Sequence, residues 1–192
     1  MNIGIYIYDD AEVLDFAGPF EVFSTTQRLV GNDWNIFFVA ETLQMVKARG
    51  VFAVYPHFSI KEHPPIDLLI VAGGMHDKEL SKIDVIDWIN RTSLSASHVA
   101  SVCTGAFLLA QAELLNGLEV TTHWEDISRL SADYPKLIVQ RKRRWVDSGK
   151  FITSAGISAG IDMSLHLVAK ISGMEHAVKT ARQMEFDWRK ES

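Results

Sequence analysis

The sequence predicts an α/β fold with a mostly parallel central sheet. Apolar runs of strand length alternate with longer segments of helical periodicity, which is the pattern of strand–helix units around such a sheet. The run Asp67-Leu68-Leu69-Ile70-Val71-Ala72 is largely apolar and ends at Gly73-Gly74, as expected for a central strand buried on both faces. A third observation is the direct passage from an apolar strand into an apolar helix at Cys103.

Length and composition predict a single domain over residues 1–192. The chain is 47% hydrophobic and 22% charged, which is typical of a globular protein of a size that can bury one core. The formal net charge of −5 opposes binding to phosphate backbones and anionic membranes, so we expect no nucleic-acid or membrane partner. One cysteine, no basic leader and no apolar run near 18 residues predict a cytoplasmic protein.

The expected elements follow from their periodicity and from the residues that separate them. Pro19 is pre-organised for the first turn of a helix, so a helix is expected from Gly18 to about Val30. The other expected helices cover 82–94, 104–115, 124–134, 159–171 and 174–188. Strands are expected over 3–8, 34–40, 67–72, 98–102 and 118–122, short strands within 46–60 as a small antiparallel ribbon, and a hairpin of 137–146 with 151–154.

The basic run Arg141-Lys142-Arg143-Arg144 lies in an alternating segment that ends at an Asp-Ser-Gly turn. A binding patch is one interpretation of such a run. We favour a solvated strand face, because alternation before a turn is typical of a half-exposed strand.

The junction at Cys103 has the form of a nucleophile elbow, the sharp strand-to-helix turn of α/β-hydrolases, with Ser101 in place of that motif's first glycine. Such a turn projects the side chain above the sheet, and the amides at the start of the next helix favour a negative sulfur, so a lowered Cys103 pKa is predicted. The amides of Thr104 and Gly74 are the expected donors to developing negative charge. Cysteine is also a common buried hydrophobe, and a glycine pair can be a plain turn.

Five further segments together resemble the ThiJ/PfpI superfamily, whose members have a class I glutamine-amidotransferase-like fold. They are Val13-Leu14-Asp15-Phe16-Ala17-Gly18-Pro19, Ala72-Gly73-Gly74, Val102-Cys103-Thr104-Gly105, Thr121-Thr122-His123-Trp124 and Ser154-Ala155-Gly156-Ile157-Ser158-Ala159-Gly160-Ile161-Asp162. The resemblance implies a flavodoxin-like, three-layer α/β/α sandwich and a homodimer. Within the superfamily the motifs are similar to isocyanide hydratases and to the N-terminal domains of AraC-type regulators, which append a DNA-binding region; because the chain stops at Ser192, we expect none here.

The resemblance also implies a role for each matching position. Cys103 matches the nucleophile, and Asp15 matches the carboxylate that hydrogen-bonds its sulfur; Asp15 could instead act only near a helix start. Thr104 matches a residue that supports the site through its amide and hydroxyl, and Gly74 matches an oxyanion donor. His123 matches the histidine that is a base in peptidase-like members, and we interpret it here as a structural or supporting group.

The remaining polar candidates are interpreted as solvated side chains: Glu21, His57, His63 and His76. Their spacing matches no metal motif, and no phosphate-binding glycine pattern occurs, so neither a metal nor another cofactor is predicted.

Three functional hypotheses remain open for this chain. The first is a cofactor-independent cysteine hydratase or hydrolase of a small molecule, with hydration of an isocyanide (isonitrile) to an N-substituted formamide as the specific reaction. The second is a non-catalytic ligand or redox sensor, in which Cys103 is oxidised reversibly. The third is a peptidase or amidase, which requires His123 within hydrogen-bond reach of the sulfur.

Overall fold

The computed structural model of the chain describes residues 1–31 and 33–191. Its described residues form a main sheet of seven strands in the order β10-β11-β7-β6-β1-β2-β5. Neighbouring strands are parallel except for the antiparallel pair β10–β11. These strands span Asn2–Tyr6 (β1), Asn35–Ala40 (β2), Phe58–Ser59 (β5), Leu68–Val71 (β6), His98–Val102 (β7), Trp145–Ser148 (β10) and Phe151–Ser154 (β11). The predicted α/β fold with a mostly parallel sheet is confirmed.

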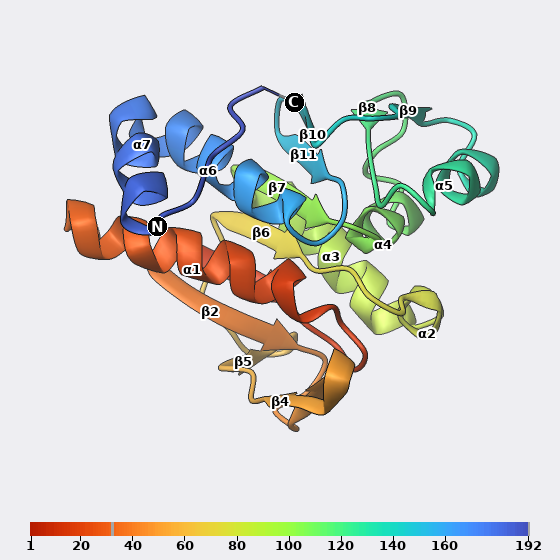
Figure 1. The fold of residues 1–192 in the computed structure, drawn as a ribbon. Coiled ribbons are helices and arrows are strands. Elements are labelled where there is room, and N and C mark those ends of the chain that lie inside the picture. Colours follow the sequence, from red (N-terminus) through yellow and green to blue (C-terminus); the bar gives the residue numbers. More distant parts are fainter. Residues whose placement is uncertain (32, 192) are drawn as a thin grey trace.

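Helices cover both faces of this sheet, which gives three layers (Figure 1). Helix α1 packs against α6 and α7 on one side, and α3 packs against α4 on the other. The helices span Val13–Val30 (α1), Asp77–Leu80 (α2), Ile83–Ser95 (α3), Gly105–Gln111 (α4), Ile127–Asp133 (α5), Ala159–Ser172 (α6) and Met174–Gln183 (α7).

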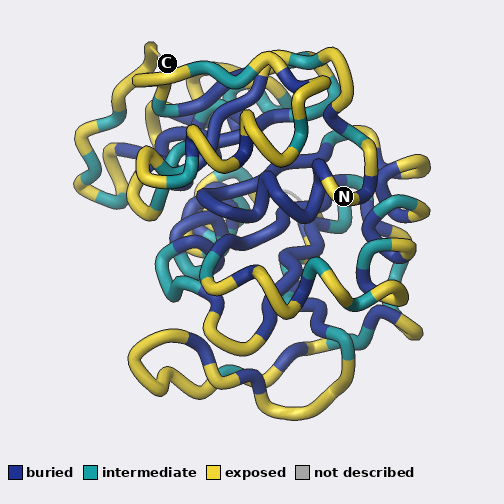
Figure 2. Tube along the Cα trace, turned by 90° about the vertical axis from the view of Figure 1, so that its right-hand side faces the viewer, coloured by how far each residue is buried: buried dark blue, intermediate teal, exposed yellow. Residues whose placement is uncertain are grey.

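The core lies along the central strands, where the tube in Figure 2 is continuously buried. All four residues of β6 are fully buried, as the apolar run predicted, and Ile3 and Ile5 of β1 are buried beside them. A strand covered on both faces reads as a continuous apolar run, which is why this element could be located from sequence. The site described below lies at the carboxyl ends of these buried strands.

Helix α1 begins earlier than expected, at Val13 instead of near Pro19, and Pro19 lies inside it. Glu12 precedes the helix in an extended conformation, so the turn that starts α1 comes directly after the Asp9-Asp10 loop. We placed the start of the helix too late because we took Pro19 for a first-turn proline. Sequence alone does not distinguish such a proline from one that lies within a helix. Asp15 therefore lies in the first turn of α1, held by helical backbone.

The region between β7 and β11 also differs from expectation. Strand β8 (Glu119–Val120) does not join the main sheet; it pairs in parallel with β9 (Ile138–Val139). Residues 140–144 consequently lie outside any strand, so the expected hairpin arm over 137–146 is reduced to β10. The ribbon expected within 46–60 is present as β3 (Val46–Ala48) and β4 (Phe52–Val54), but as a sheet of its own. Helices α4 and α7 end earlier than expected, at Gln111 and Gln183.

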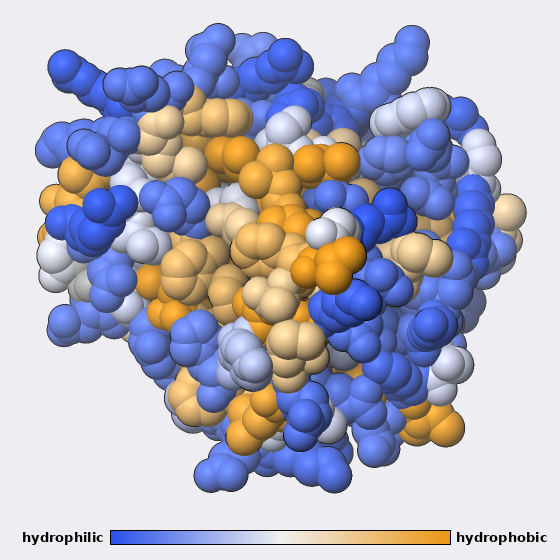
Figure 3. All heavy atoms as spheres, turned by 60° about the horizontal axis from the view of Figure 1, so that its bottom comes forward, coloured by the Kyte–Doolittle hydropathy of each residue, from blue (hydrophilic) through white to orange (hydrophobic). Residues whose placement is uncertain are grey.

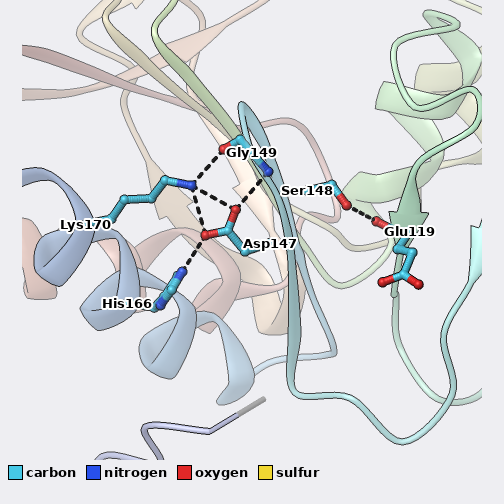
Figure 4. A network of polar contacts seen from close by, with 6 residues as sticks. All are labelled: Glu119, Asp147, Ser148, Gly149, His166 and Lys170. Atoms are coloured by element: carbon cyan, nitrogen blue, oxygen red, sulfur yellow. Dashed lines mark hydrogen bonds and ion pairs between the residues drawn. The ribbon is translucent and has the colours of Figure 1, made fainter.

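A polar network fixes the β10–β11 turn against α6 (Figure 4). The carboxylate of Asp147 accepts hydrogen bonds from the Gly149 amide at 2.9 Å and from Lys170 Nζ at 2.8 and 2.9 Å, and its Oδ2 lies 2.7 Å from His166 Nε2. The Ser148 hydroxyl donates to the Glu119 carbonyl at 2.8 Å, which attaches the β8 segment to the same turn. The network holds β11 in place, and β11 carries part of the site.

Apolar side chains gather in the middle of the face shown in Figure 3, on the side of the molecule where β4 and β5 lie. Exposed hydrophobic residues of the segment that includes β4 are Val51, Phe52 and Tyr55. The homodimer that the resemblance implied stays a prediction, and sedimentation velocity would test it.

Within residues 1–31 and 33–191, the helices are all too short or too polar to cross a bilayer.

Candidate active site

The elbow between β7 and α4 has the strained backbone that its sequence predicted. Cys103 has φ 56°, in the left-handed region that residues with a Cβ rarely adopt. It is buried, with 7% of its surface exposed. Gly105 explains how the turn closes, because a Cβ there would meet the Val71 carbonyl oxygen at 2.2 Å. The glycine two positions after the cysteine is thus required for the new helix to approach β6.

Hydrogen bonds on both sides of Cys103 hold this conformation. Its amide lies 3.2 Å from the Ser154 carbonyl oxygen and 3.3 Å from that of Ala155, and donates to both. Its carbonyl accepts the Thr122 hydroxyl at 2.8 Å. Since strained backbone persists only where the surroundings enforce it, these contacts from distant segments are what keep the elbow formed.

Asp15 is fully buried and belongs to the site. Its Oδ2 accepts the Gly73 amide at 3.1 Å, while Oδ1 makes no hydrogen bond of good geometry among the described residues. Burial, and secondarily the charge of Glu12, raise the pKa of Asp15 to about 7, against the opposing influence of the Gly73 amide, the Cys103 thiol and the Ile157 amide. The carboxyl can therefore both accept and release a proton near neutrality.

The pKa of Cys103 is raised, and the prediction of a lowered pKa was wrong. Burial is the largest cause and the Asp15 carboxylate the second, and the Thr104 amide opposes them. The helix-start argument failed because it left out the neighbouring acid and the loss of solvent. The thiol and the carboxyl form a coupled pair, in which the carboxyl titrates near neutral pH while the thiol keeps its proton.

Thr104 and Gly74 lie together, but the Gly74 amide has a different role from the one expected. It donates to Thr104 Oγ1 at 2.8 Å, and that hydroxyl donates back to the Gly74 carbonyl at 2.8 Å. The backbone at Gly74 (φ 143°), bridged to Ala11, turns the amide toward the threonine instead of the sulfur. The Thr104 amide does face the sulfur and favours its ionised form, as expected.

His123 lies outside the Cys103–Asp15 pair. Its Nδ1 is 3.6 Å from carboxylate oxygens of Glu125 and Asp126, and its ring edge packs so closely on Gly156 that a Cβ there would be 2.1 Å from His123 Cδ2. The hydrogen bonds of the described residues include none between this ring and the sulfur. Its contacts are those of a supporting group.

Several supporting residues were missed from sequence. Thr122 was quoted only as part of a motif, and nothing local signals that its hydroxyl reaches the Cys103 carbonyl. Ile157, at φ 53°, turns its amide toward Asp15. Tyr8 is buried beside the pair, and Asp15 and Cys103 are among the causes that raise its pKa, after burial and Glu79.

The other polar candidates lie elsewhere. Glu21 and His57 are exposed, and His63 Nε2 accepts the Trp88 indole at 2.8 Å. His76, interpreted as solvated, is instead 4% exposed and packs on Phe107 with ring centroids 4.4 Å apart. Across the part of the chain that the structure describes, no three His, Cys, Asp or Glu side chains are arranged to hold a metal ion.

Comparison with known proteins shows relatives of two kinds. The chain is 30% identical over 188 residues to isonitrile hydratase of Pseudomonas putida, covering 97% of this chain and 78% of that protein. It is 25% identical over 177 residues to the transcriptional regulator GbdR of Pseudomonas aeruginosa, and there the match covers 91% of this chain but 47% of the regulator. The chain thus spans about half of that regulator.

Solved structures agree with the fold. A ThiJ/PfpI family protein from Pseudomonas syringae superposes with a TM-score of 0.88 at 26% identity, covering 98% of this chain and 76% of that one. Drosophila melanogaster DJ-1beta superposes with a TM-score of 0.83 over 97% of this chain and 98% of its own, at 15% identity, which shows a shared fold alone. The model of the DJ-1/PfpI family matches residues 1–170. The chain therefore belongs to the DJ-1/PfpI family.

Proposed function

We propose that this protein is a cofactor-independent cysteine enzyme that adds water to a small substrate, and that the substrate is an isocyanide converted to an N-substituted formamide. The observation that carries the proposal is the buried pair of Cys103 and Asp15, in which the carboxyl has a pKa of about 7. A general base works best when its pKa is near the working pH. The similarity to isonitrile hydratase supports the choice of substrate.

In the first half of the reaction, the Asp15 carboxylate takes the thiol proton as the sulfur attacks the terminal carbon of the isocyanide. A carbon–sulfur bond forms, and the carbon that becomes negatively charged takes the proton back from Asp15. The product is a thioimidate, in which the sulfur and the proton of the thiol are both bonded to the former isocyanide carbon. A raised thiol pKa is compatible with this route, because the base removes the proton during attack.

In the second half, Asp15, again ionised, takes a proton from water as the oxygen attacks the thioimidate carbon. Asp15 passes this proton to the nitrogen, which gives a tetrahedral intermediate that carries the hydroxyl and the sulfur on one carbon. The carbon–sulfur bond then breaks as the formamide carbonyl forms, and the hydroxyl proton passes to the sulfur, which restores the thiol. The net change is one water added to one isocyanide. The unpaired Oδ1 of Asp15 is the atom suited to orient that water, and the Thr104 amide stabilises charge on sulfur.

The test is formamide production from n-butyl isocyanide by purified protein, followed by mass spectrometry. We expect turnover by the parent, none by Cys103→Ala, and a loss of about 100-fold or more for Asp15→Asn. Asp84→Asn is the matched control, because Asp84 lies in the first turn of α3, as Asp15 does in α1, but is exposed. Unchanged rates in both site variants would refute the mechanism.

A second candidate is a ligand or redox sensor, which the similarity to GbdR favours. Reversible sulfenic acid formation at Cys103 after mild peroxide, without turnover of any isocyanide, would favour sensing. The peptidase hypothesis is not supported by the contacts of His123, which are with Glu125, Asp126 and Gly156.

A further inference from the structure

A cleft separate from the Cys103–Asp15 pair lies beside the β8 segment. Its volume is about 380 Å³, within the range of small-molecule sites. Thr122 and Ala155 line it, and both also hold the backbone of Cys103. Cys103 and Asp15 do not line the cleft, so it is a different site.

The lining combines an apolar surface with a basic one. Trp124 and Ile127 supply apolar surface, and Trp124 is 75% exposed, which is unusual for so large an aromatic side chain. The cleft is also lined by the four basic residues Arg141, Lys142, Arg143 and Arg144. On a chain of net charge −5, this is a local concentration of positive charge.

Two of these cations, Arg141 and Lys142, have no carboxylate partner among the described residues. Arg144 is bound to the buried Asp162, with its Nε 2.6 Å from Oδ2, whereas Arg141 contacts the neutral Ser128 hydroxyl at 3.4 Å. Lys142, exposed at φ 60°, makes no ion pair with a described carboxylate. The nearby Glu125 and Asp126 face His123 and do not line the cleft.

The sequence pattern was misleading here, because residues 140–144 lie outside any strand and their run is not one face of a solvated hairpin. Because β9 pairs with β8, residues 140–144 form the connection from β9 to β10, and four of them line the same cleft as Trp124. Cations that share a cleft with an exposed indole favour a ligand that stacks on the ring and carries negative charge.

From these contacts we propose that the cleft binds a small organic anion with a flat apolar body, such as an aromatic carboxylate. The ring of the ligand stacks on Trp124, and its carboxylate lies toward Lys142 and Arg141. The inference is independent of the proposed hydratase activity, because it uses none of the residues that act on the isocyanide.

The test is isothermal titration calorimetry of the full chain with 2-naphthoate, and with uncharged 2-naphthamide for comparison. We expect saturable binding of one naphthoate per chain, at least 10-fold weaker binding of the amide, and unchanged binding in Cys103→Ala. Lys142→Glu and Trp124→Ala should each weaken naphthoate binding at least 10-fold. Lys136→Glu, an equally exposed lysine away from the cleft, is the matched control and should bind like the parent.

Circular dichroism would verify that each variant is folded before titration. Absence of saturable naphthoate binding to the parent would overturn the proposal. The proposal would also be overturned if Lys142→Glu or Trp124→Ala bound naphthoate with the same affinity as Lys136→Glu. An isocyanide assay is not part of this test, so failure of the hydratase proposal would leave its outcome unaffected.

Discussion

The Thr104 hydroxyl both accepts a hydrogen bond from the Gly74 amide and donates one to the Gly74 carbonyl, each at 2.8 Å. One side chain thus joins the turn after β7 to the turn after β6. The Thr104 amide, which faces the sulfur, and the Gly73 amide, which binds Asp15, sit on the two turns that this contact connects.

Thr104→Val should therefore destabilise the protein as well as the site. Valine has a similar shape but neither donates nor accepts, so the Gly74 amide loses its partner at a cost of about 1–3 kcal/mol. Urea unfolding would measure this change. Thr104→Ser keeps the hydroxyl and is the control; if the two variants unfold alike, the hydroxyl contact does not contribute to stability.

Asp15 should give the fold a distinctive dependence on pH. Its pKa is about 7 in the folded chain and near 3.8 in the unfolded chain, so its contribution is most favourable below pH 4 and is lost as the pH rises through 7. Between about pH 4 and 7, the parent should lose up to about 1.4 kcal/mol of unfolding free energy per pH unit relative to Asp15→Asn. Denaturant titrations from pH 4 to 8 would measure the difference, and parallel curves for the two proteins would contradict the raised pKa.

Glu12→Gln should move the pH profile of the proposed reaction. The charge of Glu12 is the second cause of the raised Asp15 pKa, so its removal lowers that pKa. The acid limb of kcat/KM, below which Asp15 is protonated, should then shift to lower pH. Glu21→Gln, which changes an exposed acid within α1, should leave the limb in place. A shift to higher pH would mean that another group controls this limb.

The backbone strain at Cys103 can be measured by comparing two variants that lack the cysteine. Glycine adopts φ 56° freely, whereas alanine retains the steric penalty of about 1–2 kcal/mol. After allowance for the greater entropy of unfolded glycine, Cys103→Gly should be more stable than Cys103→Ala by about 0.5–1 kcal/mol. Thermal unfolding of both proteins would check this order, and a more stable alanine variant would show that the elbow relaxes without its cysteine.

The parts of the fold that could be predicted were those with a local signal. Two such parts are the apolar run of β6 and the junction Val102-Cys103-Thr104-Gly105. They could be located from sequence because burial and a tight turn directly restrict which residues can occur there. The boundary of α1 was misplaced because Pro19 is permitted at more than one position of a helix. The region 118–146 was misread because the partner of β8 is β9, a long-range pairing that alternation does not encode.

The site followed the same division. Cys103 and Asp15 could be singled out as candidates because their motifs are local, and the structure places the two side chains next to each other. The sign of the Cys103 pKa shift could not be predicted, since it depends on burial and on an acid 88 positions earlier in the chain. The sequence also could not predict that the Gly73 amide binds Asp15 while the Gly74 amide binds Thr104. This assignment depends on the backbone angles of the turn, and two adjacent glycines allow several conformations.

The hydrogen bonds that hold the elbow come from Thr122, Ser154 and Ala155, all of which are synthesised after Cys103. A nascent chain that has just emerged from the ribosome with its cysteine thus has none of these restraints, and its thiol is that of an ordinary peptide. Cys103 acquires its elbow geometry only when β11, which follows it in the chain, docks beside β7. The backbone conformation of Cys103 is therefore a property of the folded sheet, and a chain that lacks β11 does not have it.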